Sequence, residues 1–319
     1  MDVKKYSREL MRLLPEFKGG FAHAIRTTIE AGYAIKTLAG RGTEAAKESH
    51  RSVAGEGDAR SQKILLAGYA EAFPQAKFLC EEATKHPRAL SLENPAGILE
   101  GTALVVDPVD CTASFAANTG DWSVGMGLME QGIPVGSILF APAKNGGLLI
   151  ASHKKSGLVS LEWNGTTKTR HQKTAKEKPL KESTLYFGVD TMRYPALAKM
   201  WTSLTSHARA VMTIPSALLG LGLAAIGRAE GIIQTPQRIW DIVPLLHALK
   251  AAGKKIVFYR IEPATGKVRW IKELDFDAFC YAPEKRVGLI AGQPGTVKKL
   301  SAMLEAAGPL VRTNTKLRD

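Results

Sequence analysis

The sequence predicts a layered α/β protein, and two observations support this. In the first part of the 319-residue chain, apolar residues at helical spacing give way to strand-like runs. In the second half, helical and strand patterns alternate in the rhythm of βαβ units. The length suits one large domain or two closely packed lobes. We place the lobes at residues 1–185 and 186–319, together forming one compact unit.

The expected elements follow in chain order. The basic, amphipathic residues 1–17 predict a surface helix, because they lack the apolar core of a secretory signal. Gln131-Gly132 predicts a hairpin turn between two strands. The patterns predict helices at 21–40, 57–74, 216–227, 241–252 and 296–307, and strands at 103–107, 123–130, 132–142, 146–152, 229–233, 255–260 and 286–291.

The composition of the chain indicates which binding partners and which cellular compartment to expect. The net charge of +13 favours anionic partners. The basic stretch 168–181 has no aromatic residues for stacking on bases, so we expect a surface loop there and do not favour nucleic acid. No stretch predicts a membrane span. Cys80, Cys111 and Cys280 form no CxxC pair, which indicates reduced thiols and a cytoplasmic location.

The stretch "LVVDPVDCTASF" (104–115) carries the first chemical signal. An apolar strand ends at Asp107, Pro108 turns the chain, and Asp110 then lies beside Asp107. Adjacent carboxylates resist ionisation unless a cation lies between them. Mg²⁺ takes oxygen ligands of this kind.

Each acid also has a purely structural explanation, because Asp107 can cap a turn and Asp110 can cap a helix. Further acids occur, however, in an ordered set. Glu81 follows another apolar segment, and Asp241 follows Trp240 at the start of a predicted helix. The whole set favours a metal site over isolated caps.

Five short segments together resemble the inositol monophosphatase family. They are "CEE" (80–82), "DPVDCTASF" (107–115), "PSAL" (215–218), "GRAE" (227–230) and "WDIVPLLHALKAAG" (240–253). The resemblance implies an αβαβα sandwich and metal-dependent hydrolysis of phosphomonoesters. It also implies two or three Mg²⁺ ions, for which Mn²⁺ can substitute, and a homodimer.

The resemblance also implies residue roles. Glu81, Asp107 and the Val109 carbonyl would bind one metal, and Asp107, Asp110 and Asp241 a second. The backbone N–H groups of Cys111 and Thr112 would hold the phosphate. The catalytic set would be Asp58, Thr112 and Glu81, with Asp58 and the Thr112 hydroxyl orienting the attacking water. Further substrate contacts would come from Lys47, Ser216 and Gln234.

Several positions depart from the family pattern. Ser114 replaces an asparagine, and Val243-Pro244 replaces two alanines. Cys111 replaces a glycine, which adds strain if that position has a positive φ and fits if only close approach is needed. Gln234 stands where inositol-specific relatives commonly have glutamate. If it contacts the substrate, it favours a more anionic ester. The alternative is a solvated loop residue.

Rival phosphatase chemistries do not match. An aspartyl-nucleophile enzyme needs D-x-D, but these acids are three residues apart. A cysteine phosphatase needs arginine six residues after its nucleophile, and Ala117 stands there after Cys111. We therefore expect a phosphatase of a small phosphorylated metabolite. The alternative is a weak or inactive family member that serves as a regulatory, nucleic-acid-binding or protein-binding module.

Overall fold

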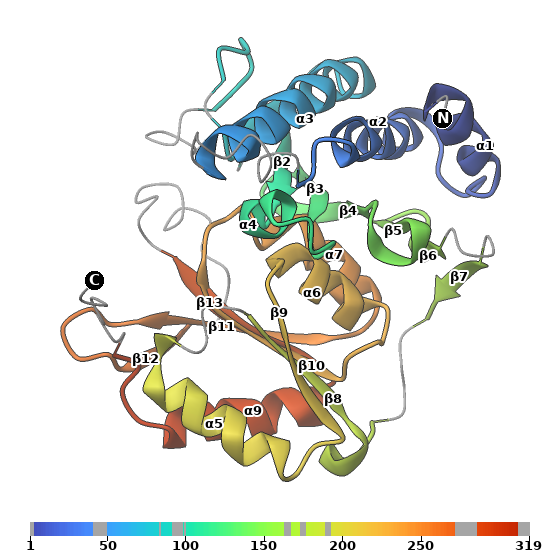
Figure 1. Cartoon of the computed structure of the whole chain (residues 1–319). Coiled ribbons are helices and arrows are strands. Elements are labelled where there is room, and N and C mark those ends of the chain that lie inside the picture. The colour runs from blue at the N-terminus through green and yellow to red at the C-terminus, as the bar shows by residue number, and fades with distance from the viewer. Residues whose placement is uncertain are drawn as a thin grey trace.

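A computed structural model shows two β-sheets that alternate with three helical layers (Figure 1). It describes residues 3–40, 50–82, 84–90, 98, 100–162, 167–172, 177–188, 193–271 and 286–311. The layers run helix, sheet, helix, sheet, helix, which confirms the predicted αβαβα sandwich. Each helical layer has its own apolar core against a sheet face.

The first sheet has the strand order of the sequence. Its strands are β1 (Lys77–Cys80), β2 (Thr102–Asp110), β3 (Ser123–Glu130), β4 (Ile133–Ala141), β5 (Leu148–His153), β6 (Gly157–Glu162) and β7 (Thr167–His171). β1 is parallel to β2, and the later pairs are antiparallel. Its outer face is covered by α1 (Val3–Arg12), α2 (Gly19–Lys36) and α3 (His50–Ala72).

The second sheet has the order β12-β11-β13-β10-β8-β9. These strands are β8 (Thr184–Gly188), β9 (Ala210–Ile214), β10 (Gly231–Gln237), β11 (Lys255–Ile261), β12 (Val268–Ile271) and β13 (Val287–Gly292). The helices α5 (Pro195–Thr205) and α9 (Pro294–Ala306) cover its outer face. Between the sheets lie α6 (Ala217–Ala225) and α7 (Val243–Ala251).

The middle layer is positioned by its own sequence and by two glycines of β3. All residues of α6 are apolar and buried, as expected of a helix with another layer on each side. A Cβ added at Gly125 would lie 2.3 Å from Leu218 Cδ1, and one at Gly127 would lie 3.0 Å from the Pro244 Cα. These glycines therefore let α6 and α7 approach the first sheet closely.

Several expected boundaries were wrong. The helix expected at 57–74 begins at His50. The strand expected to end at Asp107 continues through Pro108 to Asp110, because an irregularity in the pairing with β3 accommodates the proline. Part of the basic stretch 168–181 is the exposed strand β7, not a loop. Six further elements were not predicted, because they are short or lack a clear period: β1, β6, β8, β9, β12 and α5.

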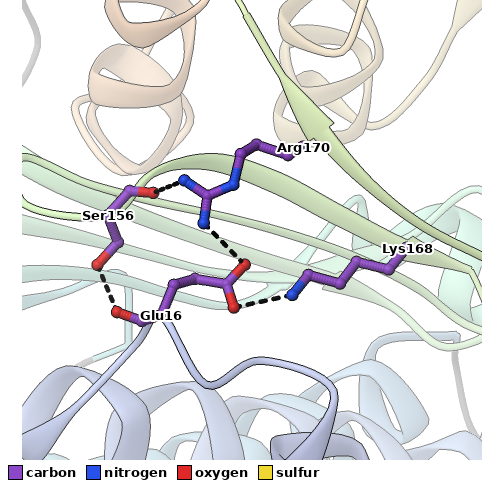
Figure 2. Close-up of polar contacts among 4 residues, drawn as sticks. All are labelled: Glu16, Ser156, Lys168 and Arg170. Atoms are coloured by element: carbon purple, nitrogen blue, oxygen red, sulfur yellow. Dashed lines mark hydrogen bonds and ion pairs between the residues drawn. The ribbon is translucent and has the colours of Figure 1, made fainter.

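The sheet edge at β7 is held by an N-terminal acid, as Figure 2 shows. The largely buried Glu16 carboxylate accepts a 2.8 Å hydrogen bond from Lys168 Nζ and lies 3.6 Å from Arg170 Nη2. Ser156 Oγ donates to the Glu16 carbonyl at 2.8 Å. These contacts fasten the segment after α1 to the β6–β7 hairpin. No helix in the described ranges has the length and apolarity that crossing a bilayer requires.

Candidate metal centre

Carboxylates from three separate segments meet at one end of the first sheet. Asp107 and Asp110 lie on β2, and Asp241 lies in the turn before α7. Each offers one oxygen, and these three oxygens all lie within 4.8 Å of one another. Glu81 directly follows β1, which is the parallel neighbour of β2. The structure thus brings three of the four predicted metal-binding carboxylates within reach of one ion, and Glu81 is near enough for its charge to act on Asp107.

The irregularity in β2 sets the direction of its two acids. Asp107 pairs with Gly125, and Asp110 pairs with Ser123, so β2 advances three residues while β3 advances two. The Val109 N–H donates to Asp107 Oδ1 at 3.1 Å, and α3 supports the bulge because Ser61 Oγ donates to the Pro108 carbonyl at 2.7 Å. The extra residue therefore lets both carboxylates serve the same site.

Asp110 also anchors the middle helical layer. Its carboxylate accepts hydrogen bonds from the backbone N–H groups of Ala217 (3.2 Å) and Leu218 (2.9 Å), which begin α6. The hydroxyls of Ser123 (3.2 Å) and Ser216 donate to the same carboxylate. An anion at a helix start is favoured by the helix dipole. Asp110 is thus both a candidate ligand and the fixing point of α6.

Burial and mutual repulsion disfavour charge on these acids. Burial first, and then the charges of Glu81, Asp110 and Asp241, raise the pKa of Asp107 well above its usual range. Burial is also the main cause that raises the pKa of Glu81 and of Asp241 to about 7. Burial and the nearby charge of Glu82 raise the pKa of Asp58, on α3, to about 7. A bound cation would reverse these shifts.

The donor set fits a hard divalent cation. Asp107 Oδ2 and Asp58 Oδ1 are buried and have no hydrogen-bond partner. A buried, unsatisfied carboxylate oxygen is costly, and a cation is the partner that satisfies several such oxygens at once. Oxygen-only ligation is typical of Mg²⁺, Mn²⁺ and Ca²⁺.

Cys111 adopts a left-handed conformation, with φ 69° and ψ 65°. Of the two alternatives left open by the sequence, strain at a positive φ is therefore the correct one. The turn delivers Thr112 to the start of the short helix α4 (Thr112–Ala116), with its hydroxyl 3.5 Å from the Val109 carbonyl. Burial raises the pKa of the Cys111 thiol, which is unfavourable for a thiolate nucleophile.

We expect Cys111→Gly to raise the free energy of unfolding by up to about 1 kcal/mol, because glycine adopts φ 69° without steric penalty. Cys111→Val should lower it, since a β-branched side chain is least tolerated there. The check is the urea midpoint of wild type and both variants. A lower midpoint for the glycine variant than for the valine variant would contradict the strain argument.

Two of the three residues predicted to make further substrate contacts, Ser216 and Gln234, are buried. Ser216 is fully buried and caps α6, because its Oγ accepts from the Leu219 N–H at 3.1 Å. Gln234 lies within β10, is 1% exposed, and places its Nε2 3.4 Å from the Ala217 carbonyl. The solvated-loop alternative for Gln234 is therefore wrong. Substrate contact by either residue stays a prediction. Lys47 lies outside the described residues, as does Cys280.

The residues that support the carboxylates were not predicted from the sequence. Ser123 binds Asp110, and Ser61 holds the Pro108 carbonyl, yet single serines in a strand and a helix carry no recognisable pattern. Arg238 was also missed. Its backbone N–H donates to Asp241 Oδ2 at 2.8 Å and so orients that carboxylate. Only the spacing of Arg238 three residues before Asp241 could have suggested this turn.

Comparisons with known proteins agree with this geometry. A model of the inositol monophosphatase family matches residues 20–293. The Nus factor SuhB of Xylella fastidiosa is 24% identical over 213 residues, which cover 65% of this chain and 69% of that protein. Inositol monophosphatase 2 of Mus musculus is 22% identical over 244 residues, which cover 74% of this chain and 79% of that protein.

Solved structures show the same fold. The extragenic suppressor protein suhB from Bartonella henselae is similar with a TM-score of 0.64 and 18% identity, covering 91% of this chain and 99% of that one. Inositol monophosphatase II from Staphylococcus aureus is similar with a TM-score of 0.61 and 18% identity, covering 88% and 93%. At these identities the likeness shows the architecture alone.

Proposed function

Since the chain belongs to the inositol monophosphatase family, we propose that it is a metal-dependent phosphomonoesterase acting on a small phosphorylated metabolite. The observation that carries the proposal is the cluster of buried carboxylates with the unpartnered Asp107 Oδ2 at its centre. A purely structural cluster would pair its acids with cations of the chain. In the described ranges, no salt bridge to Lys, Arg or His joins Glu81, Asp107, Asp110 or Asp241.

Glu81, Asp107, Asp110 and Asp241 would hold divalent ions, with the Val109 carbonyl as a further oxygen ligand. Two or three Mg²⁺ ions, or Mn²⁺ in their place, are the ions that we propose. When bound, such ions make a water molecule nucleophilic near neutral pH and stabilise the charge of the leaving alkoxide.

The chain's own groups would position the reactants. Asp58 Oδ1 is buried and has no hydrogen-bond partner, so it would accept a hydrogen bond from the attacking water and orient it. Thr112 Oγ1 would orient the same water. The backbone N–H groups of Cys111 and Thr112 would bind the phosphate oxygens, as exposed backbone donors at a tight turn do. Phosphoryl transfer depends mainly on such positioning and electrostatics.

Three further properties are part of the proposal. We propose a homodimer, in keeping with the family resemblance, and a cytoplasmic location, in keeping with the three cysteines that form no CxxC pair. We propose an anionic substrate, because the chain carries a net charge of +13 and has Gln234 where a glutamate would repel a second phosphate.

The test is phosphate release from a panel of inositol monophosphates, sugar bisphosphates, a nucleoside 3′,5′-bisphosphate and histidinol phosphate. Each would be assayed with Mg²⁺, with Mn²⁺ and with excess chelator. We expect turnover of at least one ester with either metal and loss of that turnover in chelator. Equal turnover in chelator would exclude the metal mechanism, and no turnover of any ester would favour the second candidate.

The second candidate is a regulatory role, because three of the similar proteins are named Nus factor SuhB or putative Nus factor SuhB. Asp107→Asn separates the two functions in cells that depend on this protein. If the catalytically impaired variant restores growth as well as wild type does, regulation does not require phosphatase activity.

A further inference from the structure

A cavity of about 650 Å³ lies at the β11–β12 hairpin, on the outer part of the second sheet. Arg260 on β11, Arg269 on β12 and Arg286 just before β13 all line it. Among the described residues of its lining, Glu262 is the single acid, and its carboxylate accepts a 2.6 Å hydrogen bond from Thr265 Oγ1. The cavity is therefore strongly cationic, and its size is that of a small-molecule site.

Two of these arginines oppose each other directly. Arg260 and Arg269 are partners in the antiparallel register of β11 and β12, so their side chains leave the same face of the sheet. Like charges at such a position repel and destabilise the pair. Within the described ranges, no salt bridge neutralises either of them, and the Arg260 Nε is buried without a hydrogen-bond partner. An anion between the two guanidinium groups would remove both penalties.

We propose that this cavity binds an anionic group of a small molecule, either a phosphate or a carboxylate. Arginine presents several N–H donors in a planar fork that matches the oxygens of both groups. Two opposed guanidinium groups can bind one dianion from two sides. The arginine pocket, which we define by Arg260, Arg269 and Arg286, would be preorganised for that anion because the β-ladder holds two of its members.

A short stretch of chain links the arginine pocket to the carboxylate cluster. Pro236 lines the cavity, and Asp241 is the fifth residue after it in the chain, so their Cα atoms are at most roughly 18 Å apart. If the proposed phosphatase function holds, the bound anion would be the distal group of the substrate, which would then be a bisphosphate or a phosphorylated acid.

The first experiment measures anion binding without catalysis. Protein in excess chelator is titrated with sodium sulfate against sodium chloride at equal ionic strength, and Tm is recorded. Because the metal-free carboxylate cluster repels anions, the arginine pocket is the expected site. We expect a saturable rise of about 2 °C at tenfold the dissociation constant. Arg269→Gln should lose that rise and, without sulfate, should be at least as stable as wild type.

The matched control is Lys267→Gln, because Lys267 is exposed on the same hairpin and does not line the cavity. It removes the same charge and should keep the full sulfate response. A sulfate response that is equal in wild type and Arg269→Gln would overturn the proposal. It would show a general salt effect or an adventitious anion elsewhere.

A second experiment shows whether the bound anion belongs to the substrate or to a separate effector molecule. For a distal group of the substrate, Arg269→Gln should lower kcat/KM for a bisphosphate, relative to a monophosphate, by roughly tenfold to a hundredfold. For a separate effector, that ratio stays constant while sulfate changes monophosphate turnover in wild type alone. If Arg269→Gln leaves the ratio of kcat/KM values unchanged, and sulfate leaves monophosphate turnover unchanged, the arginine pocket has no link to catalysis. Failure of the sulfate titration leaves the phosphatase proposal intact, and absence of all turnover leaves the titration valid.

Discussion

Asp107→Asn should lower kcat/KM for the best ester by at least about 100-fold, which is the scale of losing one preorganised electrostatic contact. The same variant should be more stable than wild type in chelator at pH 8. Burial and three neighbouring acids raise the pKa of Asp107 in the folded state, so wild type loses stability as the pH rises above the ordinary pKa of an unfolded aspartate. Asparagine removes the charge at nearly constant volume.

Two measurements check this prediction: steady-state kinetics with Mg²⁺, and urea unfolding of metal-free protein. In saturating Mg²⁺ the order of stability should reverse, because wild type gains more binding energy from the ion. If the variant retains wild-type activity, or unfolds more easily than wild type in chelator, Asp107 is not a ligand in a self-repelling cluster.

Asp110→Asn should also impair activity. Unlike Asp107→Asn, however, it should be less stable than wild type in chelator. The Asp110 carboxylate accepts from two backbone N–H groups at the start of α6 and from two serine hydroxyls. The amide NH₂ of asparagine cannot accept, so it leaves at least one buried N–H unsatisfied. We expect metal-free Asp110→Asn to be about 1–3 kcal/mol less stable than metal-free Asp107→Asn.

Asp107→Asn and Asp110→Asn control for each other, because both variants exchange one aspartate of β2 for asparagine. Urea midpoints in chelator give the difference directly. Equal midpoints would mean that the hydrogen bonds to α6 contribute little, and that Asp110 belongs to the cluster in the same way as Asp107 does.

The layered architecture and the four central acids were predictable from the sequence. Glu81, Asp107, Asp110 and Asp241 each end an apolar segment or precede a helix, and local patterns of that kind survive folding. The family resemblance then suggested how they combine. The contacts that support Asp110 were not predictable in the same way, because Ser123 and Ser216 reach it from segments 13 and 106 residues away. Ser216 had been expected to contact substrate instead.

Conformations set by distant partners also escaped prediction. Proline within a strand usually ends it, but here β3 provides a pairing irregularity in which Pro108 is tolerated. The positive φ of Cys111 follows from the turn that joins β2 to α4, and a cysteine does not signal that conformation as glycine would. Gln234 has the polarity of a surface residue, yet the packing of β10 beneath α6 encloses it.

The contacts of Glu16 have a consequence for how the chain folds. Lys168 is 152 residues from Glu16 in sequence, so their contact closes a very long loop. Such non-local contacts form late, because the entropy of loop closure must be overcome first. The N-terminal segment should therefore dock after the β6–β7 hairpin exists, and Glu16→Gln should speed unfolding more than it slows refolding. β7 is the edge strand of its sheet, and before that docking it also lacks its contacts with the N-terminal segment, which makes the newly made protein more prone to association at this edge.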